Sequence, residues 1–183
     1  MEKLYIGLVD TPGFFAWIIR KVIKQDYIHV VLGMDETLEE CYSVGRRWPS
    51  VPILAGFERE EKSKILKAFP SAKYMVFALE CTKEQKENIR VQLQQCYRDR
   101  FHYHYCIAGL PFLLLKKEFF REKRYTCSSF VARMLEQNGL KLFDKHFSLI
   151  TPKDFYELKH KEVIYEGELK NLPSGKRYRS EIA

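Results

Sequence analysis

The sequence lacks the cysteine spacing of a disulfide framework or a zinc cluster. Its cysteines are odd in number and include no Cys-x-x-Cys pair; they are Cys41, Cys81, Cys96, Cys106 and Cys127. Reduced thiols are the simplest interpretation, so we expect a cytoplasmic protein. His102 and His104 flank Tyr103, but two histidines without a nearby carboxylate or cysteine make a poor metal site. We therefore expect neither a metal ion nor an organic cofactor.

A long apolar run is missing as well. The stretch Phe14 to Ile23 is interrupted by Arg20 and Lys21, which argues against a signal peptide. The stretch Tyr105 to Leu115 contains Pro111 and is too short to span a bilayer. Internal repeats and low-complexity tracts are also absent. We expect a soluble protein with no stable membrane insertion.

The chain is basic but contains no recognised nucleic-acid-binding motif. A formal net charge of +7 arises from 31 basic and 24 acidic residues, which are interspersed over most of the chain. The imbalance lies mainly near the end, at Lys170, Lys176, Arg177 and Arg179. This pattern is typical of a mildly basic surface with a basic tail, so we expect no nucleic-acid partner.

The composition is that of one globular domain. A chain of 183 residues, 46% of them hydrophobic, is long enough to bury about 70% of the surface that its unfolded form exposes. No domain boundary is evident, so we interpret residues 1–170 as a single domain and 171–183 as a polar basic tail.

Local patterns predict an α+β fold. Alternation and β-branched runs predict strands at 3–9, 27–32, 40–44, 72–81 and 162–165. Amphipathic spacing and capping signals predict helices at 14–24, 83–98, 127–137 and 152–158, the first with Phe14, Trp17, Ile18, Val22 and Ile23 inward. The proline- and glycine-containing stretch 45–57 is interpreted as an ordered loop, and 58–69 is left unassigned. Because strands and helices are segregated, we expect an antiparallel sheet packed against helices.

A cysteine stands at the predicted start of the helix after Tyr125. Thr126 can cap this helix, and Asn138-Gly139 ends it. Its buried stripe consists of Phe130, Met134 and Leu135. The free backbone N–H groups and the positive dipole end of a helix start favour a thiolate at Cys127, and a thiolate attacks carbonyls. A small buried core residue is the alternative reading of the same cysteine.

A cysteine nucleophile needs a base, and His29 is the candidate that the sequence offers. It interrupts an otherwise apolar strand, where an imidazole is costly without a partner. A core histidine bonded to a backbone group is the alternative.

Four elements together resemble a known family. They are Ile28-His29-Val30, Tyr42-Ser43-Val44-Gly45-Arg46-Arg47, Tyr103-His104-Tyr105 and Thr126-Cys127-Ser128-Ser129-Phe130-Val131. This set is similar to the circularly permuted branch of the NlpC-type papain-like amidases, the YiiX-like group. The resemblance implies a permuted papain-like fold with the cysteine helix C-terminal to the histidine strand. It also implies that Cys127 is the nucleophile and His29 its base.

The third catalytic position departs from the family pattern. The resemblance implies a glutamate on the strand after the histidine, where alignment puts Ser43. A hairpin turn centred between residues 35 and 36 would instead set Tyr42 opposite His29, and a slip of two residues would bring Glu40 there. A serine or tyrosine hydroxyl can accept the imidazole N–H, although more weakly than a carboxylate.

The expected function is hydrolysis of an amide bond by a Cys-His pair. The resemblance favours a small peptide, a cell-wall fragment or an N-acyl amino acid as substrate, with Tyr103 and Tyr105 as candidate substrate-binding residues. Two alternatives stay open. One is a ligand-binding member of the fold that has lost turnover, and the other is a thiol acyltransferase acting on lipid esters, whose Asn-Cys-Glu-His motif is absent here.

Overall fold

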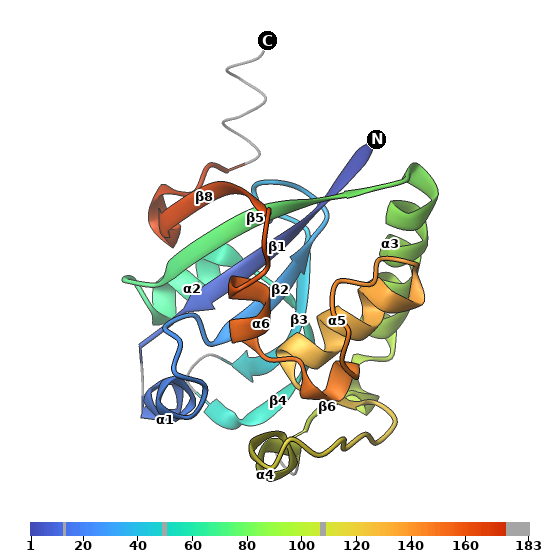
Figure 1. Cartoon of the computed structure of the whole chain (residues 1–183). Coiled ribbons are helices and arrows are strands. Elements are labelled where there is room, and N and C mark those ends of the chain that lie inside the picture. Colours follow the sequence, from blue (N-terminus) through green and yellow to red (C-terminus); the bar gives the residue numbers. More distant parts are fainter. Residues whose placement is uncertain (13, 49–50, 107–108, 175–183) are drawn as a thin grey trace.

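A six-stranded antiparallel sheet forms the centre of the structure, a computed structural model that describes residues 1–12, 14–48, 51–106 and 109–174 (Figure 1). The strands are β1 (Glu2–Asp10), β2 (His29–Gly33), β3 (Cys41–Trp48), β4 (Val51–Glu60), β5 (Lys73–Cys81) and β8 (Glu162–Glu168). Their order in the sheet is β4-β3-β2-β1-β5-β8, and each neighbouring pair is antiparallel. The α+β class with an antiparallel sheet is therefore confirmed.

Helices cover both faces of this sheet. They are α1 (Phe14–Ile23), α2 (Lys62–Ala68), α3 (Lys83–Arg98), α4 (Gly109–Leu114), α5 (Cys127–Gln137) and α6 (Pro152–Tyr156). Two short strands, β6 (His104–Tyr105) and β7 (Arg124–Tyr125), form a parallel pair beside α5. None of the helices in the described ranges is long and apolar enough to cross a membrane.

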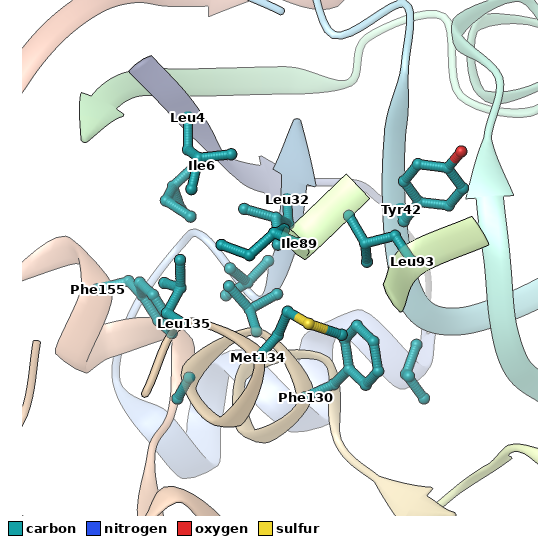
Figure 2. Close-up of a cluster of buried hydrophobic side chains, with 14 of the residues drawn as sticks. Leu4, Ile6, Leu32, Tyr42, Ile89, Leu93, Phe130, Met134, Leu135 and Phe155 are labelled. Carbon is teal, nitrogen blue, oxygen red and sulfur yellow. The ribbon is translucent and has the colours of Figure 1, made fainter. Parts of the chain in front are cut away.

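The larger core lies between the sheet and helices α3, α5 and α6. Leu4, Ile6 and Leu32 point from the strands toward Ile89 and Leu135 of the helices, as Figure 2 shows. This arrangement follows from period-2 alternation in the strands and the predicted stripe in α5, because both place apolar side chains on one face. Residues of the opposite sheet face, including Val31 and Tyr74, pack with Ile65 and Phe69 around α2.

The loop prediction for residues 45–57 is wrong, and the segment left unassigned after it has regular structure. The predicted loop is instead the end of β3 and most of β4, with residues 49–50 outside the described part, and the unassigned segment is the end of β4 followed by α2. Pro52 lies in β4, an edge strand, where the missing N–H breaks no interior ladder. Gly56 allows a close approach, since an added Cβ would lie 2.5 Å from the Tyr103 carbonyl oxygen. Pro52 is thus compatible with an edge strand, and Gly56 allows close packing.

The turn between β2 and β3 also lies further along the chain than predicted. Leu32 pairs with Tyr42 and Gly33 with Cys41, so the turn is centred on Thr37. The Asp35 carboxylate organises it by accepting the backbone N–H groups of residues 37, 39 and 40, at 2.8 to 3.0 Å. Tyr42 therefore lies opposite Leu32, and the prediction that it lies opposite His29 is wrong.

Helix α1 has the predicted bounds within one residue, but Trp17 does not point inward. Its side chain is 53% exposed, and Lys21 Nζ lies 5.9 Å from its ring. Ala16 is buried in its place. The side chains of Phe14, Ile18 and Val22 lie outside the described part, as do residues 175–183 of the predicted tail.

Replacing Phe77 by alanine tests the larger core. Phe77 on β5 is fully buried, and its loss should lower the free energy of unfolding by about 3–5 kcal/mol. Val91→Ala on α3 is the control, because Val91 is 44% exposed and should cost under ~0.5 kcal/mol. Urea unfolding followed by circular dichroism measures both. Similar costs for the two variants would contradict this core assignment.

Candidate active site

Cys127 is the first residue of α5, and a capping box fixes this helix start. Ser129 N–H donates to Thr126 Oγ1 at 3.2 Å, and Thr126 N–H donates to Ser129 Oγ at 2.9 Å. The Cys127 side chain is buried, and the backbone N–H groups of Val30 and Ser128 contribute to lowering the pKa of its thiol. The sulfur therefore lies where helix α5 meets strand β2.

An opening in the sheet makes room for this contact. Strand β2 pairs with β1 over its whole length but with β3 only at Leu32 and Gly33. His29 and Val30 therefore separate from β3 on one side, and the N-terminus of α5 meets them there. The structure thus brings His29 and Cys127 together, and each side chain shifts the pKa of the other.

The imidazole of His29 is held from its other side by a carboxylate. His29 Nε2 lies 2.6 Å from Glu60 Oε1 and 3.2 Å from Ser43 Oγ, and the Ser43 hydroxyl donates to the same Glu60 oxygen. With Nε2 engaged by these two groups, Nδ1 is the nitrogen available to the Cys127 sulfur. Ser43 therefore lies beside the histidine, but Glu60 is the residue that orients the ring.

The sequence does not indicate Glu60 as the residue that orients His29, because Glu60 lies on β4, two strands away from the histidine. In the β3–β4 ladder it lies opposite Cys41, and Ser43 lies opposite Glu58, so all four side chains share one face of the sheet. The available signal was the strand alternation Gly56, Glu58, Glu60, which was missed because β4 was divided between the predicted loop 45–57 and the unassigned segment 58–69.

Gly45 on β3 leaves the space that the imidazole ring of His29 occupies. A Cβ added at Gly45 would lie 2.8 Å from His29 Cε1 and 3.3 Å from its Nε2. Real Cβ atoms do not approach so closely, so any other residue would push the imidazole away from Glu60. The glycine of Ser43-Val44-Gly45 is thus part of the site.

Charge pairing opposes burial at all three groups. Burial disfavours imidazolium, but the Glu60 carboxylate and then the Cys127 sulfur outweigh it and raise the pKa of His29 to about 10. Burial likewise raises the pKa of the Cys127 thiol, yet the His29 imidazolium outweighs it and leaves that pKa below its ordinary value. The pKa of Glu60 is also lowered, because the His29 charge outweighs burial. These shifts together favour a thiolate–imidazolium pair beside the Glu60 carboxylate.

The other predicted site residues divide between two places. Tyr105 lies beside Cys127, and burial together with the nearby sulfur raises the pKa of its hydroxyl. Tyr103 belongs to the core instead, where it contacts Phe57 and its hydroxyl oxygen lies 3.2 Å from Cys96 Sγ. Tyr42 also faces the core, with its hydroxyl 3.3 Å from a Glu40 oxygen. Neither Tyr103 nor Tyr42 contacts His29.

Cys127 and His29 open into a cavity of about 360 Å³ between the sheet and helices α1 and α2. One part of its lining is apolar and consists of Val9, Ala16, Ile19, Ile28, Ile65 and Phe69. Another part is charged and consists of Arg46, Arg47, Glu58, Arg59, Glu61 and Lys64. Glu60 and Tyr105 also line it. A small amphiphilic molecule fits a cavity of this size and character.

Comparisons with known proteins give no relative: no family model, curated protein or solved structure matches this chain. Within the described residues no group of histidine, cysteine and carboxylate side chains is placed to hold a metal ion. All five cysteines are free thiols. Burial raises the pKa of Cys41, Cys81 and Cys96, which sets these three apart from Cys127.

Alkylation tests this electrostatic arrangement. At about pH 6, below the ordinary cysteine pKa, iodoacetamide should label Cys127 before Cys41, Cys81 or Cys96, as read by peptide mass mapping. Glu60→Gln removes the charge that raises the pKa of His29, so labelling of Cys127 should slow by roughly tenfold or more.

Glu58→Gln is the matched control for this experiment. Glu58 lines the same cavity from the same strand, but its charged neighbours are Arg47 and Arg100. The control should leave the labelling rate within about twofold of the wild type. Preferential labelling of another cysteine, or equal slowing by both variants, would contradict the assignment.

Proposed function

We propose that this protein is a cysteine-dependent amidase with a permuted papain-like fold, in which Cys127, His29 and Glu60 act as nucleophile, base and orienting carboxylate. One observation carries the proposal. A buried cysteine at a helix N-terminus has a lowered pKa and shares a cavity with a histidine that a carboxylate holds in place. The order of the elements, histidine strand before cysteine helix, agrees with the family that the sequence resembles.

The reaction follows from the charges of the resting site. The Cys127 thiolate attacks the amide carbonyl, and the C–N bond breaks as the His29 imidazolium gives its proton to the leaving amine. Neutral His29 then takes a proton from water, whose oxygen attacks the thioester, and the acid product leaves as the thiolate reforms. Glu60 and Ser43 keep the ring in one orientation through both steps.

Negative charge on the carbonyl oxygen needs hydrogen-bond donors. Backbone N–H groups at the start of α5, Ser128 among them, already point toward the Cys127 sulfur. The capping box holds this first turn rigid without consuming the Ser128 N–H. These groups are the candidate oxyanion donors. When the carbonyl carbon bonds to the Cys127 sulfur, its oxygen comes to lie beside the N–H groups of this first turn.

The cavity favours a small substrate with both apolar and charged parts. Its apolar wall suits an acyl group or an apolar side chain, and the arginine, lysine and glutamate side chains suit a charged amino-acid portion. A short peptide, a cell-wall fragment or an N-acyl amino acid meets these requirements. The alternative of an inactive ligand binder was based on the lack of a carboxylate next to His29 in the sequence pattern. Glu60 supplies that carboxylate, so this reason for expecting inactivity no longer applies.

Turnover of a small-amide library tests the proposal. Dipeptides, muropeptides and N-acyl amino acids, incubated with the protein in chelator, should include at least one that is hydrolysed. Cys127→Ala and His29→Ala should each reduce kcat/KM by about 10³-fold or more, with a smaller loss for Glu60→Gln. Glu84→Gln is the control, because Glu84 is an exposed residue of α3 and is not part of the cavity lining. Binding without turnover would favour the ligand-binding alternative, and a requirement for added zinc would refute this mechanism.

A further inference from the structure

An exposed apolar segment lies between the two elements that line the candidate active site. After Tyr105 the chain leaves the cavity, forms α4 and returns through β7 to Cys127. Four consecutive apolar residues, 112 to 115, end α4 and follow it, and Phe112, Leu114 and Leu115 are 37%, 61% and 67% exposed. Runs of exposed apolar residues are rare on monomeric surfaces unless they bind something.

Unpaired positive charges border this apolar tip. The side chains of Lys116, Lys117, Arg121 and Arg124 are exposed and make no ion pair with any residue in the described ranges. Lysines elsewhere in the fold do form ion pairs; Lys3, Lys62, Lys86 and Lys145 are examples. Only two acidic residues lie between positions 112 and 124. The tip therefore combines apolar side chains with an excess of available cations.

The base of the segment is attached firmly to the fold. Within the segment Phe119 stacks on Phe112 at 4.6 Å, and Phe120 packs edge-on against Phe147, outside the segment, at 5.1 Å. The Arg133 guanidinium lies 4.4 Å from the Phe120 ring centre. Figure 1 shows α4 at the periphery, away from the six-stranded sheet. The aromatic residues Phe119 and Phe120 thus anchor the segment, and residues 112–115 lie at its exposed tip.

We infer that residues 112–124 dock on the surface of an anionic phospholipid bilayer. Leucine and phenylalanine side chains would enter the interfacial region, and the four cations would contact phosphate headgroups. A second copy of this chain is a poorer occupant, because a two-fold interface would set the same unpaired cations against each other. Docking here would bring the cavity beside Tyr105 and Cys127 close to the membrane surface. The inference goes beyond the proposed amidase activity and does not depend on it.

Vesicle co-sedimentation tests the inference with the full chain. The protein should partition onto phosphatidylglycerol vesicles at low salt and far less onto phosphatidylcholine vesicles. Replacing Leu114 and Leu115 together by serine should reduce partitioning roughly tenfold or more. Replacing Lys116 and Lys117 together by glutamine should have a similar effect and weaken the salt dependence.

Matched controls change the same chemistry elsewhere on the surface. Val163→Ser with Ile164→Ser removes two exposed apolar side chains from β8, and Lys67→Gln with Lys159→Gln removes two exposed cations. Both pairs should bind as the wild type does, as should Cys127→Ala, which separates docking from catalysis. Absence of binding to anionic vesicles, or equal binding to both vesicle types, would overturn the inference. So would a dimer in sedimentation velocity that the leucine substitutions dissociate.

Discussion

The hydrogen bond between the His29 imidazole and the Glu60 carboxylate is the interaction on which the candidate site depends. It spans three strands, because Glu60 reaches from β4 over β3 to a histidine on β2. It also requires a glycine at position 45, since any side chain there would occupy the place of the ring. Without this bond the imidazole has neither a fixed orientation nor the charge that keeps the Cys127 pKa low.

Such a cluster is costly for a fold of this size. The side chains of His29 and Glu60 are only 21% and 14% exposed, and buried ion pairs seldom stabilise a protein more than apolar residues of the same volume would. Apolar side chains surround them on β1 and β2, so Val or Leu would be the residues expected from packing alone. Retention of a charged pair beside a helix-start cysteine is better explained by chemistry than by stability.

Residues with local signals were predictable from the sequence, and residues placed by pairing were not. The capping threonine at 126 located α5 and its cysteine, and Thr82 located α3, because caps act within one turn. Glu60 needed two correct registers. The β2–β3 register depends on Asp35, whose backbone hydrogen bonds centre the turn on Thr37, and Pro52 and Gly56 make β4 look like a loop in the sequence. Neither effect has a local signature.

The most direct test of the account is the protonation state of His29. The pKa of its ring nitrogens can be measured by nitrogen-15 NMR in the intact protein, with His29→Gln to assign the signal. The account predicts an imidazolium that persists through neutral pH and loses its proton only near a pKa of about 10. Titration near the ordinary histidine pKa of about 6.5 would contradict it, because the Glu60 carboxylate would then not stabilise a charged imidazole ring.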